Sequence, residues 1–91
     1  MDLIDAVILK DINRVKTLLR NGADPNLTIE DGLTPLHFAA AYNAVNIASV
    51  LIAAGAKVNV KNDYDETPLD IARLSDYTEL VNLLINYVGY R

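Results

Sequence analysis

The chain has 91 residues, of which 52% are hydrophobic and 22% are charged, and its formal net charge is −4. A chain of this length and apolar content forms one small folded domain and is not disordered. The negative charge argues against nucleic-acid and membrane-surface binding, so we expect a protein partner, no nucleic acid and no membrane.

The chain contains no cysteine, which excludes disulfides, thiolate zinc sites and cysteine nucleophiles. No apolar run approaches the roughly 18 residues that a membrane span requires. The N-terminus opens with Asp2 and Asp5, whereas a secretory signal opens with basic residues. We therefore expect a soluble protein in a cytoplasmic or other intracellular compartment.

A period of 33 residues runs through the chain. The residues that recur are Leu3, Leu36 and Leu69, then Ala6, Ala39 and Ala72, then Leu18, Leu51 and Leu84. The period predicts one domain of three repeats, at about 1–28, 29–61 and 62–91. Each repeat has the pattern of two short helices, and none can bury its own apolar stripe.

The first repeat begins irregularly with Met1-Asp2-Leu3-Ile4, and its second helix is expected to end near Gly22, because glycine adopts the left-handed conformation that closes helices. Basic residues lie on or near this second helix. They are Lys10, Arg14, Lys16 and Arg20. Such charges usually solvate a helix face, and binding of an acidic peptide is the alternative.

The second repeat opens with a turn at Glu30-Asp31-Gly32. Thr34 is placed to cap the following helix and Pro35 to occupy its first position, where a missing N–H costs nothing. A polar break at Asn43-Ala44 separates this helix from one whose apolar residues follow i, i+3, i+4 spacing. These residues are Ile47, Val50 and Leu51.

The third repeat follows the same plan, with a turn at Asp63-Tyr64-Asp65, a Thr67-Pro68 helix start and a break at Asp76-Tyr77. The apolar stripe of its last helix contains Leu80, Leu83 and Leu84. The turn glycine of the second repeat is replaced here by Asp65, which adopts a left-handed turn at modest cost.

These motifs resemble the ankyrin-repeat family, whose signature contains Thr-Pro-Leu-His and a closing Gly-Ala-Asp-x-Asn. The chain has Thr34-Pro35-Leu36-His37 and Gly22-Ala23-Asp24-Pro25-Asn26, with weaker copies at 67–72 and 55–59. The resemblance implies an all-α solenoid of helix-turn-helix pairs joined by hairpin-like loops, whose first and last repeats act as caps.

Catalysis is not expected, because the sequence contains no phosphate-binding glycine loop and no nucleophile elbow. His37 is the only histidine. It has no second histidine at metal-ligand spacing, and the resemblance implies that it ties neighbouring loops together. The acids Asp63, Asp65 and Glu66 raise the alternative of a calcium loop, but they lack the full ligand pattern and favour a solvated turn. We expect no metal and no cofactor.

The resemblance also implies that a partner docks on the concave face, which consists of the turn tips and the first helix of each repeat. Carried over position by position, the candidate binding residues are Ile8, Leu9, Glu30, Asp31, Leu33, Tyr42, Asp63, Tyr64, Glu66 and Leu74. Exposed apolar residues rimmed by acids are typical of a site for a basic or amphipathic segment. Packing of Leu33 and Leu74 between repeats is the alternative.

A second hypothesis is self-association of the chain as a homodimer, or the packing of further repeats. The last helix carries Val81, Ile85 and Val88, where a terminal repeat should present polar residues to water. We expect either a second chain, further repeats or the tail at 87–91 to cover them.

Overall fold

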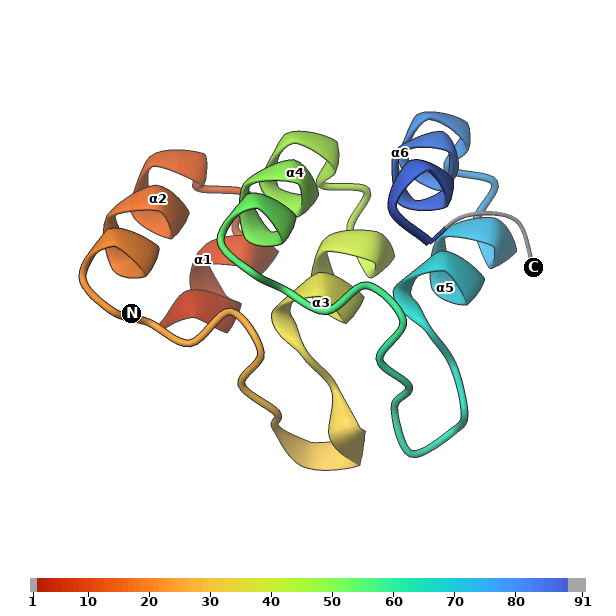
Figure 1. The fold of residues 1–91 in the computed structure, drawn as a ribbon, viewed down its shortest axis with the longest axis horizontal. Helices are drawn as coiled ribbons and strands as arrows, with labels where there is room; N and C mark the ends of the chain where they lie inside the picture. The colour runs from red at the N-terminus through yellow and green to blue at the C-terminus, as the bar shows by residue number, and fades with distance from the viewer. Residues whose placement is uncertain (1, 89–91) are drawn as a thin grey trace.

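A computed structural model of the chain describes residues 2–88 and consists of three antiparallel helix pairs (Figure 1). Each pair corresponds to one 33-residue repeat. The helices are α1 (Leu3–Ile8), α2 (Ile12–Arg20), α3 (Pro35–Ala41), α4 (Val45–Ala53), α5 (Pro68–Leu74) and α6 (Thr78–Val88), with one 3-10 turn at Glu30–Gly32. The described residues contain no strand, so the all-helical prediction is confirmed.

The helix starts follow the predicted caps. The Thr34 hydroxyl accepts from the backbone N–H of His37, and Thr67 accepts in the same way from Asp70. In return, the side chains of His37 and Asp70 accept from the backbone N–H of the two threonines, which completes a capping box in each repeat. In the first repeat Asp2 takes the cap and accepts from Asp5 at 2.9 Å.

Each pair is joined by a tight turn at which one residue has a positive φ. Lys10, Asn43 and Asp76 occupy this position in the three repeats, with φ of 57°, 54° and 56°. Gly22 and Gly55 close the second helices at φ of 98° and 104°, as the sequence predicts.

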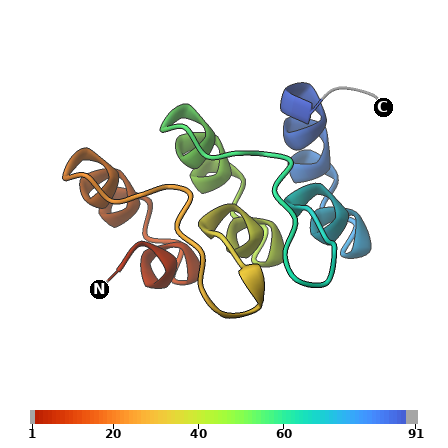
Figure 2. The same ribbon diagram turned by 60° about the horizontal axis from the view of Figure 1, so that its bottom comes forward.

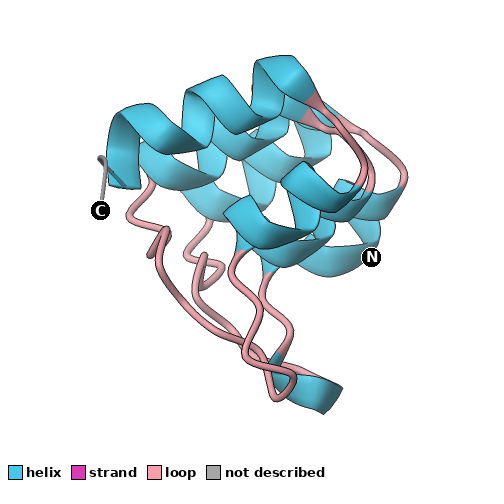
Figure 3. Cartoon of the chain, turned by 90° about the vertical axis from the view of Figure 1, so that its right-hand side faces the viewer, coloured by secondary structure: helices cyan, strands magenta, loops and turns pink. Residues whose placement is uncertain are grey.

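The helices form two layers. The first helices α1, α3 and α5 lie side by side in one layer, and α2, α4 and α6 lie side by side in the other (Figure 3). The core lies between the layers and between the repeats, and its large fully buried side chains include Leu3, Val7, Val15, Leu36, Leu51, Leu80 and Leu84. No repeat buries its apolar side chains by itself, because each repeat shares this core with its neighbour.

Two long loops project from the helix layers, as Figures 2 and 3 show. In the first loop Asp31 and Gly32 both have positive φ, which is the conformation of a tight hairpin turn. The backbone N–H of Asp63 donates to the carbonyl of Asp31 at 2.8 Å, so the two loops are joined. A side chain at Gly32 would meet the backbone of Asp63 at 3.1 Å, and this close approach explains the glycine.

No helix formed by residues 2–88 is both long and apolar enough to cross a membrane.

Candidate functional site

The candidate site has two parts that meet at an angle, the layer of first helices and the two projecting loops (Figure 2). The loops lead directly into the N-termini of α3 and α5, which fixes their position relative to the helices. We call the surface formed by α1, α3, α5 and the loop tips the concave face.

Large apolar side chains are exposed near the ends of all three first helices. Leu9 is 63% exposed, Tyr42 43% and Leu74 77%, while Ile8 is half-buried. The sequence left open whether Leu74 packs between repeats, and its exposure shows that it does not. These residues therefore form a discontinuous apolar row along the helix layer.

Two half-buried apolar residues lie beside this row and were not singled out in the sequence. Phe38 precedes Tyr42 by four residues and Ile71 precedes Leu74 by three, so each lies on the same helix face as its exposed neighbour. Both are half-buried and pack against the core. The helical spacing was the signal that could have identified them, but it equally describes core residues.

The loop tips carry the predicted acids and one aromatic residue. Glu30, Asp31 and Asp63 are exposed, and Tyr64 is 67% exposed. Leu33 is half-buried. The loop tips thus combine negative charge with an accessible tyrosine ring.

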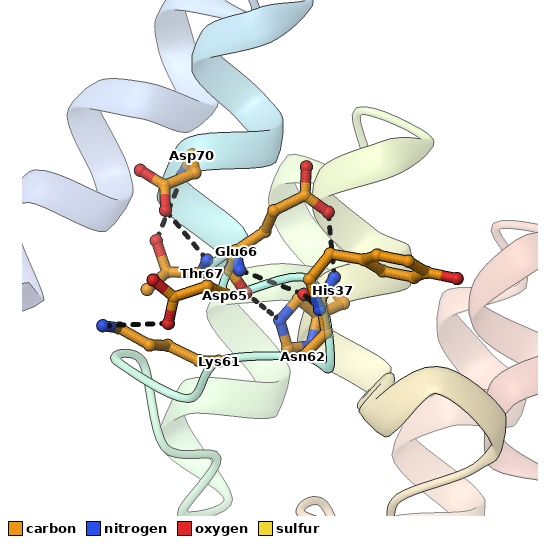
Figure 4. A network of polar contacts seen from close by, with 8 residues as sticks. His37, Lys61, Asn62, Asp65, Glu66, Thr67 and Asp70 are labelled. Carbon is orange, nitrogen blue, oxygen red and sulfur yellow. Dashed lines mark hydrogen bonds and ion pairs between the residues drawn. The ribbon is translucent and has the colours of Figure 1, made fainter.

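Glu66 differs from the other acids because its side chain is already engaged (Figure 4). It is half-buried, and its carboxylate accepts from the Asn62 side-chain amide at 3.0 Å. Asp65 pairs with Lys61 at 3.2 Å, and both side chains are largely exposed. The other described acids near the loop tips, Glu30, Asp31 and Asp63, are all exposed.

Asn62 organises the second loop and was not recognised in the sequence. It is only 7% exposed, and its side-chain oxygen accepts from the backbone N–H groups of Tyr64 and Glu66 at 2.9 and 3.0 Å. This local network holds the Asp63–Asp65 turn in one conformation. Tyr64 is therefore presented on a preformed loop.

His37 is buried and joins the second repeat to the third, as Figure 4 shows. Its Nδ1 accepts from the Thr34 backbone N–H at 3.1 Å, so the ring proton lies on Nε2, which donates to the Glu66 carbonyl at 2.9 Å. The prediction that this histidine ties neighbouring loops together is confirmed.

A second tie joins the first repeat to the second. The Asn26 side chain donates to the Gly55 carbonyl at 3.0 Å and accepts from the Lys57 backbone N–H at 2.8 Å. Asn26 lies in the closing motif of the first repeat. Both junctions therefore use one polar side chain to position the next loop, and the concave face is built on a hydrogen-bonded scaffold.

Residues 2–88 contain no group of three His, Cys, Asp or Glu side chains arranged to hold a metal ion. Asp63, Asp65 and Glu66 are thus adjacent in sequence without forming a cation site.

The residues predicted for self-association lie on α6. Val81 and Ile85 are half-buried and pack against the core, and Val88 is half-buried at the last described position. The self-association itself stays a prediction. The basic residues Arg14, Lys16 and Arg20 are exposed on α2, while Lys10 lies in the turn before it.

Comparison with known proteins identifies the repeat. The family model described as ankyrin repeats (3 copies) matches residues 3–91, almost the whole chain. A putative ankyrin repeat protein of fowlpox virus is 40% identical over 88% of this chain. The human protein phosphatase 1 regulatory subunit 27 is 40% identical over 89% of it.

The same repeats occur within larger proteins. A potassium channel of rice, KOR2, is 42% identical over 80% of this chain. The chain spans 26% of the fowlpox protein, 52% of the phosphatase subunit and 10% of the channel. The shared region is therefore a module found in proteins of different kinds.

Proposed function

Because the chain belongs to the ankyrin-repeat family, whose repeats are protein-interaction modules, we propose that it is a non-catalytic module that binds a partner on its concave face. The observation that supports this face is the row formed by Leu9, Tyr42 and Leu74. These are three of the large apolar side chains that the fold leaves exposed. Their exposure has a cost in water that a bound partner would remove.

The partner we propose is a basic or amphipathic segment of another protein. The acids Glu30 and Asp31 are exposed in the first loop, and Asp63 is exposed next to Tyr64 in the second loop. Acids of this kind raise the association rate of a basic segment, and the aromatic and aliphatic residues provide buried contact once it is bound. Tyr42 on the helix layer and Tyr64 on the loop would act as the two anchors.

Selection from a peptide library tests the proposal and does not require an identified partner. The full chain would be immobilised and used to select binders from a displayed library of random peptides. We expect the selected peptides to carry lysine or arginine together with apolar residues. Replacing both Tyr42 and Tyr64 by alanine should weaken their binding by about tenfold or more, the scale of one interface hot spot.

The matched control is Tyr87→Ala, which removes an exposed tyrosine of α6, outside the concave face. It should leave the affinity of the selected peptides unchanged. If the double variant keeps its circular dichroism spectrum and still binds the peptides with the original affinity, the concave face is not the binding site.

Self-association is a second candidate function, favoured by a different observation. The apolar residues Val81, Ile85 and Val88 of α6 have no further repeat packed on them within residues 2–88. In this case a second copy of the chain would be the partner.

A further inference from the structure

We propose that the outer face of α5 and α6 binds the same face of a second copy, so that two chains form a symmetric dimer. This gives the self-association a defined interface and does not depend on the concave-face proposal. We call the surface that contains Asp70, Arg73, Val81, Ile85 and Val88 the end face. The equivalents of Asp70, Arg73 and Val81 in the first two repeats, 33 and 66 residues earlier, are all buried, so a following repeat covers these three positions. Ile85 and Val88 have half-buried or exposed equivalents, and they extend the surface along α6.

One position on the second helix of each repeat lies where a following repeat would pack. Val15 and Ala48 occupy it in the first two repeats, and both are completely buried. Val81 occupies it in the third repeat and is only half-buried. Valine is an apolar residue of the kind that packs against a following repeat. Residues 2–88 contain no repeat after the third.

The apolar stripe of α6 extends this surface. Ile85 and Val88 follow Val81 at spacings of four and seven residues, which places all three on one side of the helix. All three are half-buried, so each leaves part of its apolar surface accessible. An isolated terminal repeat would be expected to present polar residues at such positions.

The first helix of the third repeat, α5, adds charges of both signs to the end face. Val7 and Ala40 are completely buried at the position that Arg73 occupies in the third repeat, and Arg73 is exposed. Asp70 replaces the buried His37 and is exposed. One oxygen of Asp70 accepts from the Thr67 backbone N–H, which leaves the other oxygen available for a partner.

These charges make the end face self-complementary. Asp70 and Arg73 are three residues apart on α5, so they lie on the same side of the helix. A two-fold axis perpendicular to α5 reverses the direction of this helix in the second copy, and this orientation brings Arg73 of each chain towards Asp70 of the other. A two-fold dimer is also the commonest form of homo-oligomer.

The first repeat argues against head-to-tail stacking, in which the first repeat of one chain would pack on the third repeat of another. Ile47 and Leu80 are buried at a position that packs on the preceding repeat, and the first repeat has the exposed Arg14 there. The exposed Arg14 is therefore a poor match for Val81 in a head-to-tail contact.

The test is the mass of the full chain in solution, measured by sedimentation velocity from about 10 µM to about 1 mM, the range of weak associations. We expect a concentration-dependent shift from 10.0 kDa to twice that mass. Val81→Glu and Arg73→Glu should each weaken the dimer at least tenfold. Arg73→Glu is the safer variant, because Arg73 is exposed and its replacement does not disturb the core.

The matched control is Leu74→Glu, which changes the next residue of α5 on the concave face. Its equivalent Ala41 stays exposed although a repeat follows it, so this position is outside the inter-repeat interface. Leu74→Glu should dimerise like the original chain. A mixture of Arg73→Glu with Asp70→Lys should recover the dimer, because opposite charges then face each other across the axis.

Three results would overturn the proposal. The first is a chain that remains monomeric at every concentration. The second is a dimer that is unaffected by Arg73→Glu and Val81→Glu. The third is a monomer that dimerises only after residues 89–91 are deleted, since the tail would then be the natural cover of the end face.

Discussion

The turn residue inside each helix pair shows how one backbone conformation restricts the residue type. Lys10, Asn43 and Asp76 all have φ near +55°. Asparagine and aspartate tolerate the left-handed region because their short side chains bond locally, whereas lysine has no such compensation. The positive φ therefore costs more free energy at Lys10 than at Asn43 and Asp76, the equivalent residues of the other two repeats.

Replacing Lys10 by asparagine should stabilise the protein by about 0.5–1 kcal/mol, because asparagine adopts the left-handed conformation more readily. Urea unfolding followed by circular dichroism measures the change. Lys16→Asn is the control, since Lys16 is exposed within α2 and asparagine is the weaker helix former there. The explanation fails if Lys10→Asn lowers the midpoint as much as Lys16→Asn does.

Asp65 offers a similar test in the second loop. Its φ is 65°, and its equivalent in the first loop is Gly32, with φ of 70°. Asp65→Gly should stabilise the fold by a few tenths to about 1 kcal/mol, because glycine has no penalty at positive φ. The lost ion pair with Lys61 is largely exposed and contributes little.

The reverse substitution, Gly32→Ala, is the comparison for Asp65→Gly. The added Cβ would lie 3.1 Å from the Asp63 backbone nitrogen in a position that already has positive φ. Thermal unfolding should show opposite signs for the two variants. A lower melting temperature for Asp65→Gly would show that the Asp65 side chain contributes more than its backbone conformation costs.

At the scale of whole elements, His37 determines how the second repeat meets the third. His37→Ala leaves the buried Thr34 backbone N–H and the Glu66 carbonyl without their partner, which should cost about 1–3 kcal/mol. Chemical denaturation provides the measurement. Asp70→Ala at the equivalent position removes only an exposed cap interaction and should cost about 1 kcal/mol. Equal losses for the two variants would refute the role of the inter-repeat bond.

The elements themselves were predictable from the sequence because their signals are local. Thr34-Pro35 and Thr67-Pro68 mark helix starts within two residues, and Gly22 marks a helix end. The 33-residue period then predicted that the helix pairs stack on one another. The all-helical fold and its family were predictable from these signals together.

The parts of the site that could not be predicted depend on contacts between distant residues. Asn26 and Gly55 are 29 residues apart, and nothing local in the sequence indicates their hydrogen bond. The Asn62 network is short in sequence, but it requires the loop conformation to be known first. The exposure of Tyr42 and Leu74 was predicted from the sequence. The half-buried Phe38 and Ile71 were not distinguished, because their helical spacing is also that of core residues.

Over the whole molecule, the net charge is unevenly distributed among the repeats. Residues 1–28 contain four acids and four bases, and residues 29–61 contain two of each, so both are neutral. Residues 62–91 contain six acids and two bases, which accounts for the whole net charge of −4. The described ion pair Lys61–Asp65 involves only one of these acids. The third repeat is therefore the part of the molecule most affected by repulsion between carboxylates.

Salt should consequently stabilise the protein. Raising the ionic strength from about 0.01 M to about 0.15 M shortens the screening length from about 30 Å to about 8 Å and weakens the repulsion within the third repeat. We expect a gain of a few tenths of a kcal/mol in the free energy of unfolding, the scale of exposed charge interactions.

Asp76→Asn locates this effect, because asparagine already holds the same left-handed turn at position 43. It should stabilise the protein at low salt and reduce the gain on adding salt, since it removes one of the repelling carboxylates. Asp11→Asn is the control, because asparagine caps α2 equally well but the first repeat has no excess of acids. If both variants change the salt dependence equally, the repulsion is spread over the molecule and does not originate in the third repeat.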